Sequence, residues 1–449
     1  LTDFHHLVII RGMGKNEAPP SSRKKTKLAT FKAGRLAQRA LAFTKEVLAQ
    51  SGPRKSGSLA ALEAAELIKS ELETTCDTVE SQQVPIDSKI NTRLFTLVVY
   101  AYPAVVLLCL VGLPYLGLLL SVLVLWFSFE TFGRYKPRYL APTDMGVNVH
   151  GIIEPVNAVE STIVFTAHHD SAPIERFEKK KAMIPFGLVG GAALLSFLQT
   201  AVELTQLRLF RPNFPPILLF LLGLGLLGGL YYVRTLLEYY TDEVAPGAGD
   251  NLISVGILTA LAHHFKAEPP SKTRIILASF DGEEIFLQGS TAWYEAHKEA
   301  LEGAVVLNFD SIFSAEHLVF LERDANATLP LSKSLARKCV NIARSMGYEA
   351  SALSMPILGG ATDAASAARI GLEATTLTAS SWSDGVYHTK DDTLAAIDPE
   401  SVERSIGIAI RLARLLDQDS LWDDDLPIEE EKVEEPTNPT LVFSKLTRR

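Results

Sequence analysis

Long apolar runs limit the folds that this chain can adopt. Residues 94–131 are almost free of charged side chains, and two further runs cover 182–202 and 214–233. As one helix, residues 94–129 would be about 54 Å long, well beyond the roughly 30 Å hydrocarbon core of a bilayer. A hairpin that turns near Gly112, Leu113 and Pro114 fits that thickness better. We therefore predict four transmembrane helices, arranged as two hairpins at 94–131 and 182–233.

The alternative for each run is the core helix of a soluble protein, but several runs of this length in one chain argue against it. The middle of each run lacks ionisable residues, which favours an anchor over a transport path. Basic residues flank both hairpins, namely Lys89, Arg93, Arg134, Lys136, Arg138, Arg176 and Lys179 to Lys181. The four runs predict a multi-pass integral membrane protein. The positive-inside rule then predicts that the part of the chain outside the membrane lies in the cytoplasm.

Outside these runs, short β-branched segments alternate with segments of helical periodicity. Buried strands are predicted at 162–167, 273–280 and 304–309, and helices at 57–73, 253–265, 329–346 and 399–416. Such alternation is typical of an α/β fold with a mainly parallel sheet flanked by helices.

Charge divides the chain further. Residues 1–50 are basic around Arg23 and Lys24 and are predicted to form a disordered arm, with attraction to anionic lipid as the alternative. Residues 51–416 then form the folded domain, which the hairpins interrupt. Residues 417–449 are acidic and contain prolines, so we predict a disordered tail.

Composition excludes two classes of protein. The net charge is −9, and no basic stripe with interleaved aromatic residues is present, which argues against nucleic acid as a partner. The three cysteines are too few and too scattered for a disulfide framework or a thiolate metal site. Any metal must therefore be bound by histidine and carboxylate groups.

Polar clusters follow the predicted strands, where open α/β sheets place their ligand sites. One acidic pair in isolation is more often structural or solvated, but here several clusters combine imidazole with carboxylate, which suits zinc. Two metals about 3.5 to 4 Å apart need a bridging carboxylate and separate ligands for each ion. The candidates are His168, His169, Asp170, Asp250, Glu283, Glu284, Asp310 and His388.

These clusters occur together with RKSGS at 54–58 and NVHG at 148–151. In this order they resemble the di-zinc exopeptidases, a family that includes leucyl aminopeptidases, glutamate carboxypeptidase and the glutaminyl cyclases. The resemblance implies two Zn²⁺ ions with Asp250 as the bridge. It further implies that His168 and Asp310 bind one ion and that Glu284 and His388 bind the other.

The resemblance also implies catalytic roles. Glu283 becomes the general base, and Asp170 orients the metal-binding His168. His169 is expected to be an ordinary packed or exposed histidine. The segment GGATD at 359–363 resembles the family's later substrate-side segment, and Asp363 is predicted to cap a helix, with a pocket role as the alternative.

Together these features predict a membrane-anchored, zinc-dependent hydrolase of amide or peptide bonds, of the aminopeptidase type. The second hairpin is inserted between Asp170 and Asp250, which ties the site to the bilayer and makes membrane-proximal substrates one option. Two alternatives stay open. One is a cyclase like the glutaminyl cyclases, which use one zinc, and the other is an inactive binding protein of the same fold.

Overall fold

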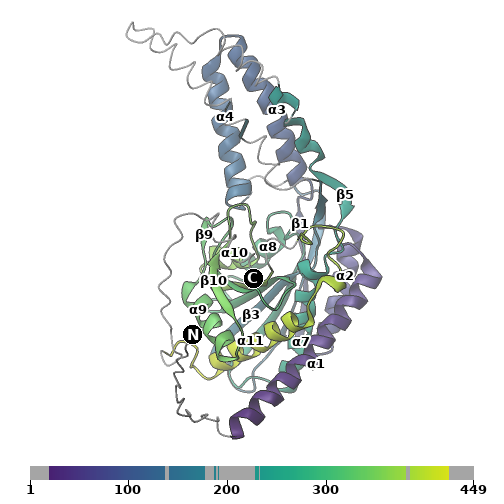
Figure 1. The fold of residues 1–449 in the computed structure, drawn as a ribbon, viewed down its shortest axis with the longest axis vertical. Coiled ribbons are helices and arrows are strands. Elements are labelled where there is room, and N and C mark those ends of the chain that lie inside the picture. Colours follow the sequence, from purple (N-terminus) through teal and green to yellow (C-terminus); the bar gives the residue numbers. More distant parts are fainter. Residues whose placement is uncertain are drawn as a thin grey trace, which may run out of the picture.

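A single large sheet organises the domain. The computed structural model describes residues 20–136, 141–176, 187–188, 191, 228–231, 233–380 and 385–423. Within these residues, nine strands form a sheet in the order β1-β2-β6-β3-β7-β11-β8-β10, with β9 beside β8 (Figure 1). They are β1 Thr78–Ile86, β2 Asp144–Ile153, β3 Ser161–His168, β6 Thr273–Phe280, β7 Val305–Ile312, β8 Leu318–Asp324, β9 Leu329–Pro330, β10 Ala350–Ser354 and β11 Glu373–Ala379.

The strand directions correct part of the prediction. The central strands β6, β3, β7 and β11 are parallel, as predicted. Towards the edges, β1 with β2, β2 with β6, β11 with β8 and β8 with β9 are antiparallel, so the sheet is mixed. The connection from β7 to β8 covers only residues 313–317, too short for the crossover that a parallel return requires. Alternation of segments along the sequence does not reveal such local reversals.

Helices cover both faces of the sheet. One face is covered by α1 Pro20–Ser51, α2 Leu59–Glu73, α7 Ile253–Ala267, α9 Lys333–Ser345 and α11 Pro399–Asp417. The opposite face packs against α8 Gln288–Ala296 and α10 Ala364–Arg369. The predicted helices occur, although the one predicted from 329 begins at Lys333, because Leu329–Pro330 pairs with β8 and Ser332 caps α9 by accepting the N–H of Leu335.

The prediction of a disordered arm is wrong where the chain forms α1. Ala33, Ala37, Ala40 and Val47 are buried, and α1 packs against α7 and α11. The helix approaches closely at Gly256, where a Cβ would lie 2.6 Å from the carbonyl oxygen of Ala40. The buried face of α1 consists mainly of alanines. Because lysines and arginines surround these alanines in the sequence, the composition of the segment did not reveal a buried face. Residues 1–19 lie outside the described part of the chain.

The folded domain includes the first residues of the segment that was predicted to be a disordered acidic tail. Asp417 accepts the backbone N–H groups of Ser271, Lys272 and Thr273, and Leu421 is buried. Residues 424–449 lie outside the described residues.

Two helices stand apart from the sheet. α3 Ile90–Leu110 and α4 Pro114–Ser128 lie side by side and project away from the domain, joined by residues 111–113 (Figure 1). This is the helix pair and the turn predicted for 94–131, and α4 continues into η1 Phe129–Gly133. Among the described residues, Ile90–Leu108 and Pro114–Gly133 are long and apolar enough to cross a membrane. The predicted second hairpin, 182–233, lies almost entirely outside the described residues.

Candidate metal centre

The polar clusters converge at one edge of the sheet. His168 ends β3, Asp310 lies in β7, and Glu283 and Glu284 follow β6. Because these three strands are parallel neighbours, their carboxyl ends meet at the same edge. Asp250 lies in η3 Ala248–Leu252, directly before α7, and His388 lies in the loop before α11.

The five predicted ligands form two groups that share Asp250. The Nε2 atom of His168 lies 3.4 Å from Oδ1 of Asp250 and 4.0 Å from Oδ2 of Asp310. The Nε2 atom of His388 lies 3.2 Å from Oδ2 of Asp250 and 3.4 Å from Oε2 of Glu284. Within each group the candidate ligand atoms lie within 4.8 Å of one another, a spacing that one metal ion could bridge.

Glu283 lies beside both groups. Its Oε2 atom is 3.8 Å from Nε2 of His168, and His168, Glu283 and Glu284 together also have the spacing of a metal site. Geometry alone therefore does not separate the role of Glu283 from that of Glu284, and the distinction rests on the resemblance.

Buried polar atoms test whether a metal fits here. Nε2 of His168, Oδ2 of Asp250 and Oε1 of Glu284 are buried and make no hydrogen bond. Such atoms are costly unless a partner satisfies them, and four carboxylates in one buried cluster repel one another unless cations lie between them. The oxygen and imidazole donors match the preferences of zinc, so the residues fit a pair of such ions.

The pKa shifts of the carboxyl groups also reflect how closely these groups are buried together. Burial raises the pKa of Glu283 well above its ordinary value, and Glu284 and Asp310 add to the shift. Burial likewise raises the pKa of Glu284 to about 8. Burial alone would raise the pKa of Asp250 as well, but its interactions with His168 and His388 lower it below the ordinary value. The site thus holds more carboxylate than its own histidines can neutralise.

Asp170 connects one histidine to the loop that carries the two glutamates. Its Oδ1 atom lies 3.3 Å from Nδ1 of His168, and its two oxygens accept the backbone N–H groups of Glu283 and Glu284 at 3.3 Å. Ser56 donates to Oδ2 of Asp170 at 2.7 Å. Asp170 therefore has the contacts that a group orienting His168 would need.

Three residues at the site were not singled out from the sequence. Asp392 accepts the backbone N–H groups of Gly249 and Asp250 at 2.7 and 3.2 Å, and Oε1 of Glu175 lies 3.4 Å from Nδ1 of His388. Arg54 is fully buried and donates to the carbonyls of His169, Pro246 and Gly247. Arg54 belongs to the motif RKSGS quoted above, and Asp392 lies four residues after His388 in the segment YHTKDDT at 387–393. Their nearness in sequence to the predicted site residues was the signal that could have found them.

Two weaker expectations have different outcomes. His169 is buried, with Nδ1 2.9 Å from Oγ of Ser279, which is the packed histidine that was expected. Asp363 occupies the N-cap position of α10, but its side chain makes no capping hydrogen bond. It is instead a buried carboxyl whose pKa burial raises to about 7. The prediction of a helix cap is therefore wrong, because the side chain turns into the domain and not back onto its own helix.

A second cluster, Glu80, His150 and His297, has the spacing of a metal site on strands β1 and β2 and beyond α8. Trp293 donates its indole N–H to Nδ1 of His150 at 3.3 Å. Neutral His150 then carries its proton on Nε2, where a metal would need a lone pair. This contact favours a histidine hydrogen-bonded to Trp293 over a metal site.

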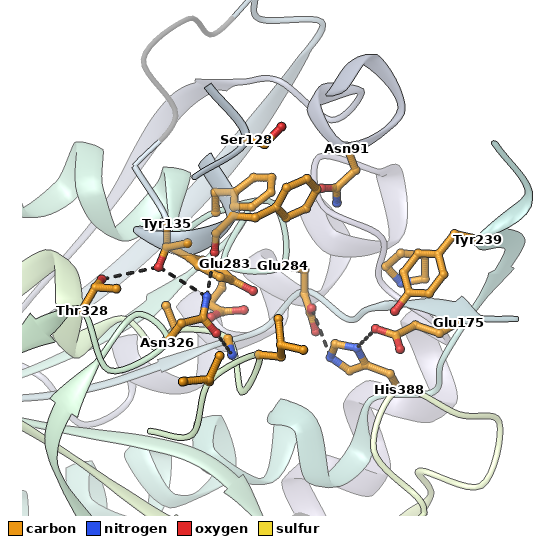
Figure 2. Close-up of a pocket in the computed structure, with 18 of the residues that line it drawn as sticks. Asn91, Ser128, Tyr135, Glu175, Tyr239, Glu283, Glu284, Asn326, Thr328 and His388 are labelled. Atoms are coloured by element: carbon orange, nitrogen blue, oxygen red, sulfur yellow. Dashed lines mark hydrogen bonds and ion pairs between the residues drawn. The ribbon is translucent and has the colours of Figure 1, made fainter. Parts of the chain in front are cut away.

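A cavity of about 500 Å³ opens onto the first cluster (Figure 2). Asp250, Glu283, Glu284, Asp310 and His388 line one end, together with Glu175 and Tyr387. Figure 2 shows His388 between Glu284 and Glu175, with Asn91 and Ser128 on the far side of the aromatic side chains. The cavity thus extends from the carboxylate cluster to the base of the α3–α4 helix pair.

Comparisons with known proteins give a consistent result. Residues 231–413 match the profile of Peptidase family M28, whereas no curated protein matches the chain. A leucine aminopeptidase precursor from Bacteroides thetaiotaomicron is similar in structure, with a TM-score of 0.50, 13% identity and coverage of 84% of this chain and 96% of that one. A Zn-dependent exopeptidase from Parabacteroides distasonis has a TM-score of 0.50, 14% identity and coverage of 84% and 97%. A glutaminyl cyclase from Bacteroides thetaiotaomicron, bound to N-acetylhistamine, has a TM-score of 0.50, 13% identity and the same coverage. At this identity the likeness shows a shared fold.

Proposed function

We propose, from the premise that residues 231–413 match peptidase family M28, that this chain is a membrane-anchored zinc hydrolase of amide bonds, of the aminopeptidase type. The observation that carries the proposal is the pair of ligand groups sharing Asp250. One ion would be held by His168, Asp250 and Asp310, and the other by Asp250, Glu284 and His388.

Zinc bound there supplies a Lewis acid, which polarises the scissile carbonyl and lowers the pKa of the attacking water. Glu283 removes the proton from that water as the carbon–oxygen bond forms. It then returns the proton to the leaving nitrogen as the carbon–nitrogen bond breaks. Glu283 lines the cavity, and its Oε2 atom lies 3.8 Å from Nε2 of His168, which supports this role.

Neighbouring residues keep the ligands in place. Asp170 orients His168 and holds the Glu283–Glu284 segment through its backbone, while Glu175 does the same for His388 from the opposite side. Asp392 fixes the backbone at Asp250. Because each of these contacts restrains a ligand or its backbone, little rearrangement is needed when the metals bind.

The α3–α4 pair supports membrane anchoring. Its outer faces expose large apolar side chains, including Leu119, Val122, Leu123 and Trp126, which water would solvate poorly. Lys89, Arg93, Arg134 and Lys136 flank its base, which by the positive-inside rule supports a cytoplasmic position of the enzyme domain. The second hairpin, 182–233, remains part of this proposal on its sequence alone.

Metal content and substrate choice test the proposal together. The purified protein should contain about two zinc ions per chain and release amino acids from aminoacyl amides. A cyclase would instead convert N-terminal glutaminyl peptides to the cyclic product, and one zinc per chain would accompany it. Protein without zinc and without either activity would support the inactive binding protein and overturn the hydrolase.

A further inference from the structure

Aromatic side chains form a continuous wall of the cavity at the base of the α3–α4 helix pair. Phe95 of α3 stacks on Phe132 of η1 with ring centroids 5.5 Å apart, and Phe132 meets Phe286 edge-on at 5.4 Å. Tyr239 contacts Phe95 edge-on at 5.7 Å. All four rings line the cavity between the carboxylate cluster and the base of α3 and α4. Part of the cavity wall, including Phe95 and Phe132, is therefore built from the proposed anchor and its continuation η1.

Charge is distributed unevenly along this cavity. Every acidic residue that lines it belongs to the metal end, and none of the described lining residues is a lysine or arginine. A carboxylate or phosphate at the aromatic end would thus lose its water without gaining a described cation, which is costly. A chain of methylene groups would lose no hydrogen bonds there and would gain from leaving water.

Two polar atoms mark the far end of the aromatic stretch. Oδ1 of Asn91 and Oγ of Ser128 are buried without a hydrogen bond, and both residues line the cavity at the base of α3 and α4 (Figure 2). Buried polar atoms of this kind are normally satisfied by water or by a ligand. The apolar stretch therefore has a polar group at each end, the metal cluster and this pair.

The cavity also reaches the surface of the molecule. Phe129 and Ile357 line it and are 54% and 77% exposed. Phe129 follows α4 directly, where the exposed apolar surface of the helix pair meets the domain. In a bilayer-inserted hairpin, this opening would face the lipid surface, where amphiphilic molecules concentrate.

We propose that the natural substrate is an amide carrying a long alkyl or acyl chain. The chain lies against Phe95, Phe132 and Phe286 while the amide reaches the metal cluster. The inference rests on the proposed hydrolase function, since the scissile amide must lie at the metals. It adds the class of substrate and assigns the α3–α4 pair to the substrate site.

A series of alkyl hydroxamates tests the chain site separately from turnover. The hydroxamate group binds zinc in every member, so only the chain differs between acetohydroxamate and octanohydroxamate. Each methylene that leaves water contributes up to about fourfold in affinity. We expect octanohydroxamate to bind at least about tenfold more tightly than acetohydroxamate in the parent protein. A smaller ratio would overturn the inference.

A matched pair of variants locates the chain. Leu125 lines the cavity, whereas Leu123 lies on the same helix, is exposed and does not line it. Leu125→Trp should fill part of the apolar stretch and reduce the affinity ratio at least about threefold. Leu123→Trp should keep the parent ratio in the same detergent, which controls for partitioning of the inhibitors. Equal ratios in the two variants would overturn the assignment of the site.

Zinc analysis distinguishes the two levels of proposal. Protein that neither contains zinc nor binds acetohydroxamate would overturn the hydrolase, and the inferred substrate with it. Protein that contains zinc and binds acetohydroxamate, but gains nothing from a longer chain, would overturn the substrate class alone.

Discussion

Oδ2 of Asp250 lies 3.2 Å from Nε2 of His388, although every element from α7 to β11 lies between the two residues along the chain. The other oxygen of the same carboxylate lies 3.4 Å from Nε2 of His168. One side chain thus faces both histidines, and each group of ligands depends on it.

The first prediction follows from this arrangement. Asp250→Ala removes a ligand from both proposed metals, so the variant should lose most of both zinc ions and not only one. Zinc measured by atomic spectroscopy after gel filtration checks this. Asp391→Ala is the control, because Asp391 is exposed and belongs to neither ligand group. Full zinc occupancy in Asp250→Ala would contradict the shared site.

The second prediction separates the base from the ligands. Glu283→Gln should keep zinc close to the parent level but reduce kcat about 100- to 10,000-fold, because the amide cannot accept the proton of water. Glu284→Gln should lose zinc instead. Zinc content and turnover measured on the same preparations decide the matter, and the opposite pattern would exchange the two roles.

The third prediction concerns Asp170. Asp170→Asn should weaken zinc binding about 10- to 100-fold, because an amide holds the imidazole of His168 less firmly in its binding tautomer. Chelator competition gives the dissociation constant. Ser56→Ala, which removes one hydrogen bond to Asp170 and leaves the carboxylate in place, should have the smaller effect. An unchanged constant in Asp170→Asn would exclude the orienting role.

The fourth prediction tests topology. Cys339 is buried and cannot report on accessibility, so single cysteines are best introduced after replacing the three native ones. Glu299→Cys, on the exposed surface of the domain, should react with an impermeant maleimide only after the cells are permeabilised. Val111→Cys, at the tip of the α3–α4 pair, should react in intact cells. The reverse pattern would place the enzyme domain outside.

The fifth prediction tests whether α1 belongs to the folded domain. Gly256→Ala would bring a Cβ within 2.6 Å of the Ala40 carbonyl oxygen, so it should destabilise the protein by about 1 to 3 kcal/mol. Gly34→Ala is the matched control on α1, since its Cβ would meet only the flexible carboxylate of Glu403 at 3.3 Å. That variant should be neutral or gain up to about 1 kcal/mol from helix propensity. Thermal unfolding compares the two, and equal melting temperatures would contradict the close packing of α1.

Local patterns allowed much of the fold to be predicted. The strand at 273–280 coincides with β6, and the turn near Gly112 separates α3 from α4, because hydrophobic period and turn residues act over a few neighbours. The antiparallel edges of the sheet and the packed helix α1 were not predicted, since strand direction and helix docking depend on partners distant in sequence.

The sequence by itself determined which residues are candidates to bind metal, since His168, Asp250, Glu284, Asp310 and His388 supply imidazole and carboxylate groups in the order of the family that they resemble. The tertiary structure decided which of these candidates lie close enough to share an ion, because donors form a possible ligand group only when the path of the chain brings them within a few ångströms. It also decided that Asp392 contacts the backbone at Asp250 and that Glu175 contacts His388. It decided further that Asp363 is buried and does not cap its helix. The proximity of the candidate metal site to the α3–α4 pair also depends on the tertiary structure, since the side chains that line one cavity come from segments that only folding brings together.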